Sequence, residues 1–465
     1  MKKGILTGIK IFAAVALAAG IAAYFCFTPV ALADEDRSDL MRTGTYAEGL
    51  KVWGEDIGTM TYAQAKELLL KKEQEYKSSI SFTLTGGGNT FVIGADELDI
   101  RFNTDSVLKE ALFLAKEGTL NERRAEQERI KTADLEITCT VNPVTAAGRA
   151  VSAAKTLEKE SSDASLEFIP KESRFVYTPE VYGTTVDTEA LCTAVVRQAE
   201  TLEFSPIEIP LKEIAPKVTE QMLRDVTVKR TAFFTSFADS PYNDANRVHN
   251  IKKCVEIINS SGKTTLKPGE ELSLNAVLGP RTASGGWKEA PGYVGGKTVD
   301  QPGGGVCQIS TTLYGAALTA DLEVTDRINH SIPVGYSKKG MDATISTGGP
   351  DLKIKNSTGS NIYLAARIAD GTKVYFDIYG EPFSGFDGIS LSSVKIKDIA
   401  PEAEMKITVD ENYPSDYEDI TVKRRTGSFW RTYKVYKKDG EEILRKETYT
   451  STYKAFAGEK TVGTQ

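Results

Sequence analysis

The sequence predicts an α+β protein of several domains. Its 465 residues are enough for about three domains of ordinary size. Strand patterns are mixed with helix patterns up to about residue 385, whereas the tail from residue 390 carries strand patterns alone. We therefore expect α+β folds in the larger part of the chain and an all-β module at its C-terminal end.

The composition is that of an ordinary globular protein and excludes several function classes. Hydrophobic residues make up 40% and charged residues 26% of the chain. A net charge of -7 argues against a nucleic-acid partner. The sequence contains neither a phosphate-binding loop nor a dinucleotide fingerprint. The 2 histidines and the irregularly spaced cysteines give no zinc-ligand spacing, so we expect no metal and no cofactor.

Residues 1–33 read as a targeting segment. Lys2 and Lys3 supply positive charge, and an apolar run follows over residues 11–27. Extended to Ala33, the segment is long enough to cross a bilayer, and we favour a single N-terminal membrane anchor. The alternative is secretion after cleavage behind Ala33. Both readings place the rest of the chain outside the cytoplasm, in the cell envelope.

Residues 44–228 are expected to form a separate module. It begins with a short strand over 52–58 and an amphipathic helix from Thr61 to about Tyr76. Two weakly similar segments follow, each a strand pair with a helix capped by Thr or Asp, joined by a polar helix. The expected elements are strands 81–84 and 91–93 with helix 104–117, the joining helix 143–160, and strands 165–168 and 175–177 with helix 187–199.

The tail over residues 390–465 is expected to be all strand. Residues 430–436 alternate in the strand period, and the turn Lys438-Asp439-Gly440 leads into a second strand from Ile443. A last strand is expected at 460–464.

The segment 303–314 carries the clearest chemical signal. Three glycines precede Cys307, which opens a predicted helix through Ala320. A thiol at a helix N-terminus is favoured as thiolate, and the backbone amides around Gly305 could bind an oxyanion. The pattern predicts a cysteine nucleophile for acyl transfer. The alternative reading is a small buried residue after a tight turn.

His330 is the expected partner base of Cys307. It follows the Cys307 helix closely and is expected to begin or precede a strand. His249 lies inside a predicted helix and reads as a surface or capping residue. An acid that orients His330 could be Asp342 or Asp351, both beside turn residues, and we prefer Asp342.

The stretch from about 231 to 381 resembles the VanW domain. The resemblance implies a catalytic α+β domain, placed at 229–385, with Cys307 as nucleophile and a peptidoglycan stem peptide as substrate. Some members of the family are understood as L,D-transpeptidases. The matching positions are Asn250-Ile251, Pro268-Gly269-Glu270, Ser273-Leu274-Asn275, Gly279, residues 303–314, His330-Ser331, Tyr336, Gly340, Asp342-Ala343-Thr344, Asp351-Leu352 and Asn356.

The flanking regions also resemble known modules. Residues 44–228 resemble a repeat that often precedes VanW domains and to which peptidoglycan binding is ascribed. The other reading of this region is a spacer, which is compatible with binding. Residues 390–465 resemble a degenerate G-five domain, a β module associated with cell-wall adhesion.

The VanW resemblance implies a two-step acyl transfer. Cys307 attacks the carbonyl of the third stem residue and expels the terminal D-alanine, and a side-chain amine of a neighbouring stem then resolves the thioester. His330 moves the protons, oriented by Asp342. Gln308 is a candidate oxyanion donor or a helix cap, and Ser310 is expected to cap or line the site. The residues expected to contact substrate are Gly304, Gly305, Gln308, Ser310 and Tyr336.

The expected function is therefore a peptidoglycan L,D-transpeptidase that forms three-to-three cross-links. Two alternatives remain: a non-catalytic wall-binding or scaffold protein, and an amide hydrolase that uses the same cysteine. The expected partners are stem peptides, the cell wall and, through the N-terminal segment, the cytoplasmic membrane.

Overall fold

The computed structural model describes residues 32–238, 244–294 and 297–464, which form two compact units. The first unit contains the described residues up to 161 together with 182–215, and the second contains 162–181 and the described residues from 216 onward. The predicted apolar run over 11–27 lies outside the described residues. Among those that are described, no helix is long and apolar enough to cross a membrane. The domain boundaries 44–228, 229–385 and 390–465 stay predictions.

In its described residues, the first unit combines six helices with short strands in small sheets. Its helices are α1 (Asp34–Thr43), α2 (Tyr62–Ser78), α3 (Thr104–Ala111), α4 (Leu120–Ile130), α5 (Pro143–Ala154) and α6 (Thr188–Thr201). Its strands are β1 (Lys51–Val52), β2 (Glu55–Asp56), β3 (Ser81–Gly86), β4 (Asn89–Gly94), β5 (Ile100–Phe102), β6 (Asp134–Leu135), β7 (Cys139–Val141), β10 (Gly183–Val186), β11 (Ile207–Glu208) and β12 (Leu211–Ile214). Its 3₁₀ turns are η1 (Ala95–Glu97) and η2 (Lys155–Leu157).

Helix starts in the first unit follow the capping residues that the sequence supplies. Thr61 and Gln64 form a reciprocal capping box at the start of α2, and the Asp187 side chain accepts from the backbone amide of Ala190 at the start of α6. The expected helix over 104–117 stops at Ala111, because the chain turns and Ala115 takes a positive φ of 57°.

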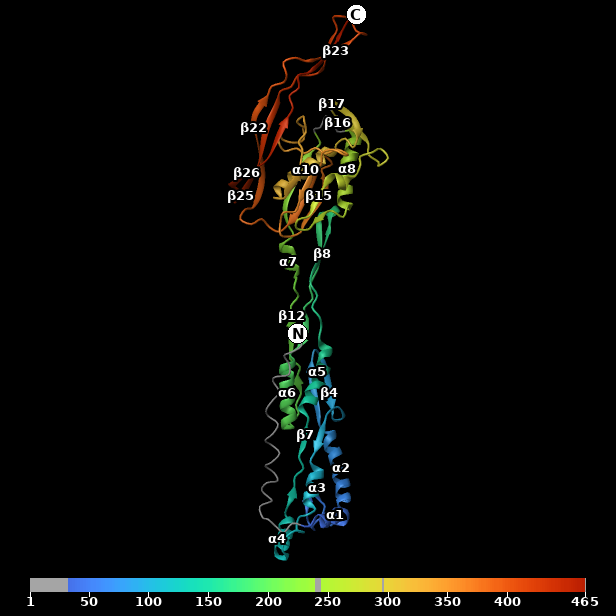
Figure 1. Cartoon of the computed structure of the whole chain (residues 1–465), viewed down its shortest axis with the longest axis vertical. Helices are drawn as coiled ribbons and strands as arrows, with labels where there is room; N and C mark the ends of the chain where they lie inside the picture. The colour runs from blue at the N-terminus through green and yellow to red at the C-terminus, as the bar shows by residue number, and fades with distance from the viewer. Residues whose placement is uncertain (1–31, 239–243, 295–296, 465) are drawn as a thin grey trace. The chain divides into compact units, whose positions relative to one another are not determined.

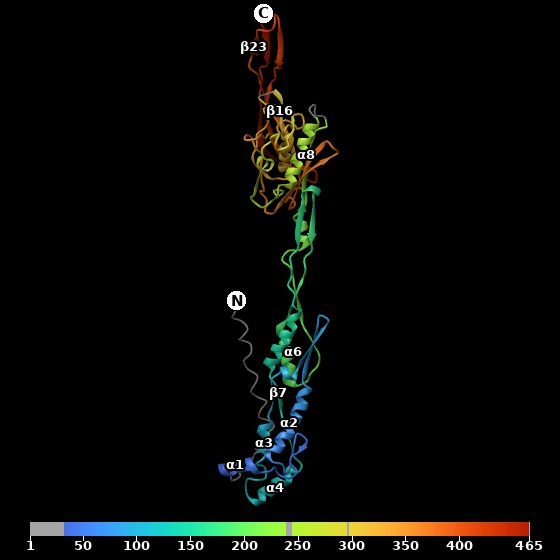
Figure 2. The ribbon, with the colours of Figure 1, turned by 90° about the vertical axis from the view of Figure 1, so that its right-hand side faces the viewer.

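The first unit is held by two hydrophobic clusters. One joins α5 and α6 to β3 and β4 and includes Ala150, Leu191 and Phe82. The other lies where α2 and α3 run side by side, as both views show (Figures 1 and 2), and includes Leu69 and Leu108. Both helix pairs meet through small or aliphatic side chains at helical spacing, as expected for amphipathic helices.

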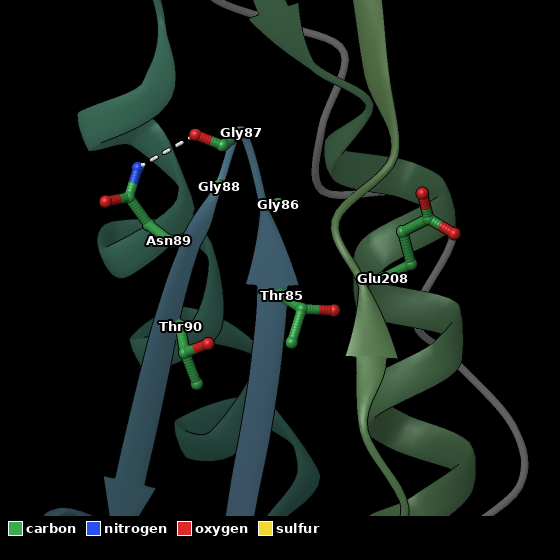
Figure 3. A pocket seen from close by; sticks show the side chains of 7 residues that line it. All are labelled: Thr85, Gly86, Gly87, Gly88, Asn89, Thr90 and Glu208. Atoms are coloured by element: carbon green, nitrogen blue, oxygen red, sulfur yellow. Dashed lines mark hydrogen bonds between the residues drawn. The ribbon is translucent and has the colours of Figure 1, made fainter.

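An open surface hollow lies at the tip of the β3–β4 hairpin (Figure 3). Residues 85–90 and Glu208 of β11 line it, and Asn89 Nδ2 donates to the carbonyl of Gly87 at 3.2 Å. The lining is mostly backbone and short polar side chains, with Glu208 as the one carboxylate among these lining residues.

The second unit contains four helices and the larger share of the strands among the described residues. Its helices are α7 (Glu220–Asp225), α8 (Ala245–Ser260), α9 (Leu274–Leu278) and α10 (Val306–Thr319), and its 3₁₀ turn is η3 (Pro170–Glu172). Its strands are β8 (Ser165–Ile169), β9 (Arg174–Thr178), β13 (Val228–Ser236), β14 (Thr265–Leu266), β15 (Glu271–Ser273), β16 (Glu289–Val294), β17 (Lys297–Pro302), β18 (Glu323–Asp326), β19 (Lys353–Lys355), β20 (Ile362–Ala369), β21 (Lys373–Gly380), β22 (Gly388–Ile399), β23 (Lys406–Asp410), β24 (Glu418–Val422), β25 (Gly427–Lys438), β26 (Glu441–Tyr453) and β27 (Glu459–Gly463).

The centre of the second unit is α10 packed on a four-stranded sheet of order β13-β21-β20-β14 (Figure 1). The helix lies so close to β13 that a Cβ on Gly315 would sit 2.2 Å from the ring of Phe233. Apart from Cys307, every residue of this fully described helix is buried. An apolar helix that is covered on all sides belongs to a domain core, so α10 is a rigid base for the residues at its N-terminus.

The tail of the chain is all strand, as predicted. Strands β22, β25 and β26 form one antiparallel sheet, and β23, β27 and β24 form another. The turn between β25 and β26 uses positive φ at Asp439 and Gly440, the conformation that short hairpin loops require. Within the second unit β22 contacts α10, and Tyr449 of β26 packs edge-on against Tyr314 of that helix, so this sheet covers part of the helix.

The β8–β9 hairpin belongs to the second unit, although the helix expected to follow it, α6, belongs to the first. Phe175 packs edge-on against Tyr363 and Tyr379 of the central sheet, and Phe168 contacts the same two rings. At the hairpin turn, Ser173 Oγ donates to Asp377 Oδ2 at 2.9 Å. Aromatic packing and a buried carboxylate therefore attach this hairpin to the central sheet.

Candidate active site

The glycine turn before α10 brings the backbone into contact with its neighbours. A Cβ on Gly304 would lie 2.3 Å from the carbonyl oxygen of Ala290. Gly305 caps the helix with φ of 101°, and a Cβ there would meet Arg247 Cγ at 2.8 Å. The lack of space therefore requires glycine at position 304, and both the lack of space and the dihedral angle require it at position 305. Cys307 follows as the second residue of α10, with part of its side chain open to solvent.

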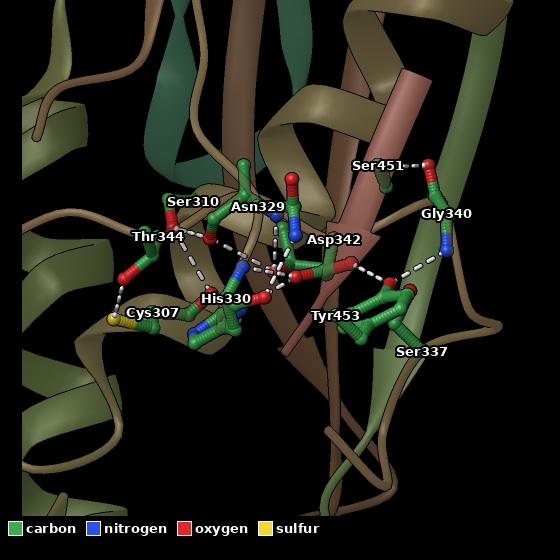
Figure 4. A network of polar contacts seen from close by, with 12 residues as sticks. Cys307, Ser310, Asn329, His330, Ser337, Gly340, Asp342, Thr344, Ser451 and Tyr453 are labelled. Carbon is green, nitrogen blue, oxygen red and sulfur yellow. Dashed lines mark hydrogen bonds and ion pairs between the residues drawn. The ribbon is translucent and has the colours of Figure 1, made fainter. Parts of the chain in front are cut away.

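The thiol of Cys307 lies against the segment that follows Asp342 (Figure 4). Its Sγ is 3.5 Å from Thr344 Oγ1 and 3.4 Å from the carbonyl oxygen of Ile345. The Thr344 hydroxyl can donate to a thiolate, whereas the carbonyl can accept only from a thiol. Sequence reasoning gave Thr344 no role. Its separation of two residues from Asp342, which places both on one side of an extended chain, was the available signal.

His330 is buried beside Cys307, and Asp342 fixes its ring. Its exposed fraction is 8%, and its Nδ1 lies 2.7 Å from Asp342 Oδ2. Its backbone amide donates to the same oxygen at 2.7 Å. With Nδ1 held by the carboxylate, Nε2 is the ring nitrogen left for Cys307. Figure 4 shows the ring between the thiol and the carboxylate.

The segment that carries His330 and Asp342 is irregular. His330 was expected to begin or precede a strand, but no strand forms between β18 and β19 in this fully described stretch. Only an isolated bridge between Ile328 and Thr344 joins its two ends. The segment is held instead by side chains, among them Arg327, whose Nε donates to the carbonyl of Asp342 at 2.8 Å.

Asp342, and not Asp351, meets His330. Asp342 is 1% exposed and also accepts a hydrogen bond from Tyr453. Asp351 lies at the start of α9, where it accepts from Ser273 Oγ at 2.5 Å and from the amide of Asn275 at 2.9 Å. Its carboxylate therefore holds a helix start and is committed away from His330.

The charges of these groups are coupled. Burial acts to raise the pKa of the Cys307 thiol, but the hydrogen bond and charge of His330 outweigh it and lower the pKa to about 7. Burial also opposes the charged form of His330, yet Asp342 and Cys307 raise its pKa to about 9. The pKa of Asp342 is lowered, against burial, by His330. Near pH 8 the three groups therefore form a thiolate, an imidazolium and a carboxylate.

Gln308 lies away from the thiol, inside the core. Its Oε1 accepts from Arg247 Nη2 at 2.6 Å, and its Nε2 donates to Thr235 Oγ1 at 2.9 Å and to the carbonyl of Ser236 at 3.0 Å. The side chain is 0% exposed. Both ends of the amide thus tie α10 to β13 and α8, which leaves backbone groups as the candidate oxyanion donors.

The backbone at the helix start supplies uncommitted amides beside the thiol, those of Gly305 and Cys307. The amides of Val306 and Gln308 donate to the carbonyls of Gly303 and Gly305 at 3.1 and 3.0 Å. Among the hydrogen bonds of the described residues, none uses the amide of Gly305 or that of Cys307. An open amide in the first turn is what an oxyanion requires.

Of the remaining residues expected at the site, Ser310 supports it from the core and Tyr336 lies beside it. Ser310 is buried and donates to the carbonyl of Ala343 at 2.6 Å, so it holds the Asp342 segment on α10. Tyr336 is partly exposed, and its ring centroid lies 6.5 Å from that of His330. His249 lies on the surface of α8, where Nε2 contacts the carbonyl of Gly286 at 3.1 Å. In the described part of the chain, no three His, Cys, Asp or Glu residues are clustered as metal ligands would be.

Two family models match the chain. Residues 246–379 match the model described as "VanW like protein", and residues 91–208 match the model described as "Putative peptidoglycan binding domain". The first match contains Cys307, His330 and Asp342. The second lies in the region expected to bind peptidoglycan or to act as a spacer.

Two curated relatives are similar over part of their length. "Uncharacterized protein YoaR" of Bacillus subtilis (strain 168) is 34% identical over 170 residues, which cover 37% of this chain and 54% of that protein. "Vancomycin B-type resistance protein VanW" of Enterococcus faecalis (strain ATCC 700802 / V583) is 32% identical over 130 residues, which cover 27% and 46%. The chain thus spans about half the length of the curated relatives that it matches.

Solved structures of G5 domains are among those that align with a smaller part of the chain. "IgA1 Protease G5 domain structure" is 14% identical, with a TM-score of 0.13, over 17% of this chain and 88% of that one. "Crystal structure of HP0197-G5" is 13% identical, with a TM-score of 0.10, over 16% and 97%. Scores this low carry no argument, so the G-five resemblance of the tail stays a prediction. The family matches are firmer: residues 246–379 of this chain are similar to the VanW-like family, and residues 91–208, which precede them, are similar to the putative peptidoglycan-binding family.

Proposed function

We propose that this chain is an extracytoplasmic L,D-transpeptidase that forms three-to-three cross-links between peptidoglycan stem peptides through a Cys307 thioester. The observation that carries the proposal is the Cys307–His330–Asp342 arrangement at the N-terminus of α10. The two family matches supply the class of substrate, since one domain is of the VanW type and the other of the peptidoglycan-binding type.

The first half-reaction is acylation of the thiolate. Cys307 Sγ attacks the carbonyl carbon of the third residue of a donor stem, and the tetrahedral oxyanion is met by the amide of Cys307. The intermediate collapses when His330 gives its proton to the departing amine of the terminal D-alanine. The products are a thioester on Cys307, free D-alanine and a neutral His330.

The second half-reaction is transfer to an amine. Neutral His330 accepts a proton from the side-chain amine of an acceptor stem as that nitrogen attacks the thioester carbonyl. The C–S bond breaks, and the thiolate faces an imidazolium again, as at the start. One amide bond is exchanged for another, so the reaction needs no outside source of energy or electrons.

Asp342 acts through His330 in both steps. The backbone amide of His330 holds Asp342 Oδ2 in place, and a turn of the ring would break the Nδ1 hydrogen bond to that buried oxygen. Ser310 supports this arrangement, since it fixes Ala343, the residue after Asp342, on the buried helix.

A scaffold without chemistry is the less favoured function. A binding protein gains nothing from a partly exposed thiol of lowered pKa beside a buried histidine–carboxylate pair. Such perturbed groups gather at sites that do chemistry. Hydrolysis of the same thioester by water remains the second candidate, because it uses the same three residues and differs only in the acceptor.

The test is intact mass spectrometry of the protein incubated with a disaccharide-tetrapeptide, together with analysis of the released muropeptides. We expect a covalent adduct and a dimeric muropeptide, both absent in Cys307→Ala. Cys192→Ser, which removes a partly buried cysteine of α6 in the first unit, is the matched control and should behave as wild type. An adduct with tripeptide and no dimer would indicate the hydrolase. Neither adduct nor product, with retained wall binding, would contradict an enzyme.

A further inference from the structure

The end of β26 runs along the irregular segment that carries His330 and Asp342. These strand residues lie well beyond residue 379, where the VanW match ends. Four residues of the strand and Lys454, directly after it, make hydrogen bonds to residues 324–331, which run from β18 into this segment. The contacts are Tyr449 Oη to the Val324 carbonyl, Arg327 Nη1 to the Thr450 carbonyl at 3.1 Å, Arg327 Nη2 to Ser451 Oγ at 2.9 Å, Asn329 Nδ2 to the Thr452 carbonyl at 2.9 Å, and the Lys454 amide to the Ser331 carbonyl at 2.9 Å.

Tyr453 reaches the site itself. Its side chain is 1% exposed, and its hydroxyl donates to Asp342 Oδ1 while accepting from the backbone amide of Gly340 at 2.6 Å (Figure 4). The other carboxylate oxygen of Asp342 is the one that holds His330. One carboxylate is therefore bonded on both sides, to the histidine through Oδ2 and to the tail of the chain through Oδ1.

The same sheet also fixes the peptide two residues before Asp342. Thr432 Oγ1 of β25 donates to the carbonyl of Gly340 at 2.7 Å, and Tyr453 accepts from the amide of that residue. Gly340 has φ of 89°, and a Cβ there would lie 2.7 Å from Ser393 Oγ of β22. All three strands of this sheet therefore meet the turn that leads into Asp342.

We propose that Tyr453 is a positioning residue of the Cys307 site, and that the C-terminal β sheet thereby completes a site otherwise built from the VanW-like domain. A carboxylate bonded through one oxygen can rotate about its Cβ–Cγ bond, whereas one bonded through both cannot without breaking a buried hydrogen bond. Tyr453 sets the direction of Asp342, Asp342 sets the ring of His330, and the ring sets the ionisation of the thiol. The inference rests on the proposed function in taking Cys307 as the nucleophile.

The test must separate Tyr453 from the other charged and titratable groups nearby. Those facing Asp342 are His330, Arg327, Tyr314, Tyr336 and Tyr453. Those facing Cys307 are His330, Cys254, Arg281 and Tyr336. Burial, followed by Asp342, raises the pKa of Tyr453, so its hydroxyl stays protonated and acts as a donor throughout the range in which the thiol titrates.

The experiment measures the rate at which iodoacetamide alkylates Cys307 in the full chain, from about pH 5 to about pH 10, by mass spectrometry of the peptide that contains it. In Tyr453→Phe, Asp342 loses the donor that favours its charged form, and His330 is held less firmly. We expect the midpoint of the pH profile to move up by about one unit, from near 7 toward the value of an ordinary thiol.

Tyr449→Phe is the matched control. It removes the same hydroxyl from the same strand, but that hydroxyl donates to the backbone of Val324 and has no contact with Asp342. We expect it to leave the midpoint unchanged, and thermal unfolding of both variants reports any common loss of stability. A low midpoint shared by wild type and Tyr453→Phe would overturn this inference and leave the proposed function standing. A wild-type midpoint like that of an ordinary thiol would overturn both.

Discussion

The backbone amide and the ring Nδ1 of His330 donate to one and the same oxygen of Asp342, each at 2.7 Å. This double contact removes the usual freedom of a histidine to exchange the roles of its two nitrogens. The direction of Nε2, and with it the ionisation of Cys307, is therefore decided by a carboxylate that does not itself contact the thiol.

Asp342→Asn is expected to disable the site while leaving the fold in place. An amide can still occupy the space, but it cannot hold a charged imidazolium, so turnover should fall by up to about 10⁴-fold. The folded pKa of Asp342 is below its usual value, so its stabilising effect is present above about pH 3.9 and is lost as pH falls through the folded pKa. Acid unfolding of the variant, followed by circular dichroism, should accordingly be less steep than that of wild type.

Turnover should depend on pH in a bell shape. The thiolate forms as pH rises through the Cys307 pKa of about 7, and the proton needed by the leaving amine is lost as pH rises through the His330 pKa of about 9. Because the pKa of the thiol is the lower of the two, the active pair exists between these values. Rates of D-alanine release across this range would check it, and a profile that keeps rising above about pH 9 would exclude His330 as the acid.

Gly304→Ala should destabilise the second unit, because its Cβ would meet the backbone carbonyl of Ala290 at 2.3 Å. Backbone cannot move aside cheaply, and we expect a loss of about 1–3 kcal/mol in the free energy of unfolding. Gly335→Ala is the control from the same site, since its Cβ would meet nothing within 4 Å. Urea unfolding of the two variants tests the difference, and equal midpoints would contradict the close approach at Gly304.

The sequence predicted those site residues that can be recognised from their neighbours in the chain. Cys307 follows a glycine turn at a helix start. His330 and Asp342 lie in the next irregular segment, and all three residues are among the positions that resemble the VanW domain. Tyr453 was missed because it lies 111 residues from Asp342 in an alternating strand, where one tyrosine looks like another. The packing of the C-terminal sheet decides which strand residue contacts the site, and that packing cannot be predicted from the local sequence pattern.

Gln308 and the β8–β9 hairpin show the same limit. A polar side chain in the first turn of a helix can face the site or the core, and the choice depends on β13 and α8 lying on that side. The hairpin strands were predicted correctly, but they pack in a different unit from α6, the helix that follows them in sequence. Local structure was thus predictable from pattern and capping, whereas partners distant in sequence were not.

Gln308→Leu should therefore change stability and not thiol chemistry. The variant leaves the hydroxyl of Thr235 and the guanidinium of Arg247 without the amide that each contacts, at a cost of about 1–3 kcal/mol in unfolding free energy. The pH midpoint for alkylation of Cys307 should stay near 7. A large shift in that midpoint without loss of stability would contradict this and indicate that Gln308 acts on the thiol.

Thr344→Val tests the hydroxyl closest to the thiol. Valine keeps the shape of threonine but cannot donate to the thiolate, whose sulfur lies 3.5 Å from Thr344 Oγ1. The hydroxyl is one of the groups that lower the pKa of Cys307, after His330, so the alkylation midpoint should rise by less than in Asp342→Asn. Thr325→Val, at an exposed threonine bonded to Glu271, is the control and should leave the midpoint in place. If Thr344→Val and Thr325→Val behave alike, the thiolate is stabilised by His330 and the helix start without help from Thr344, and the segment after Asp342 serves only to position the acid.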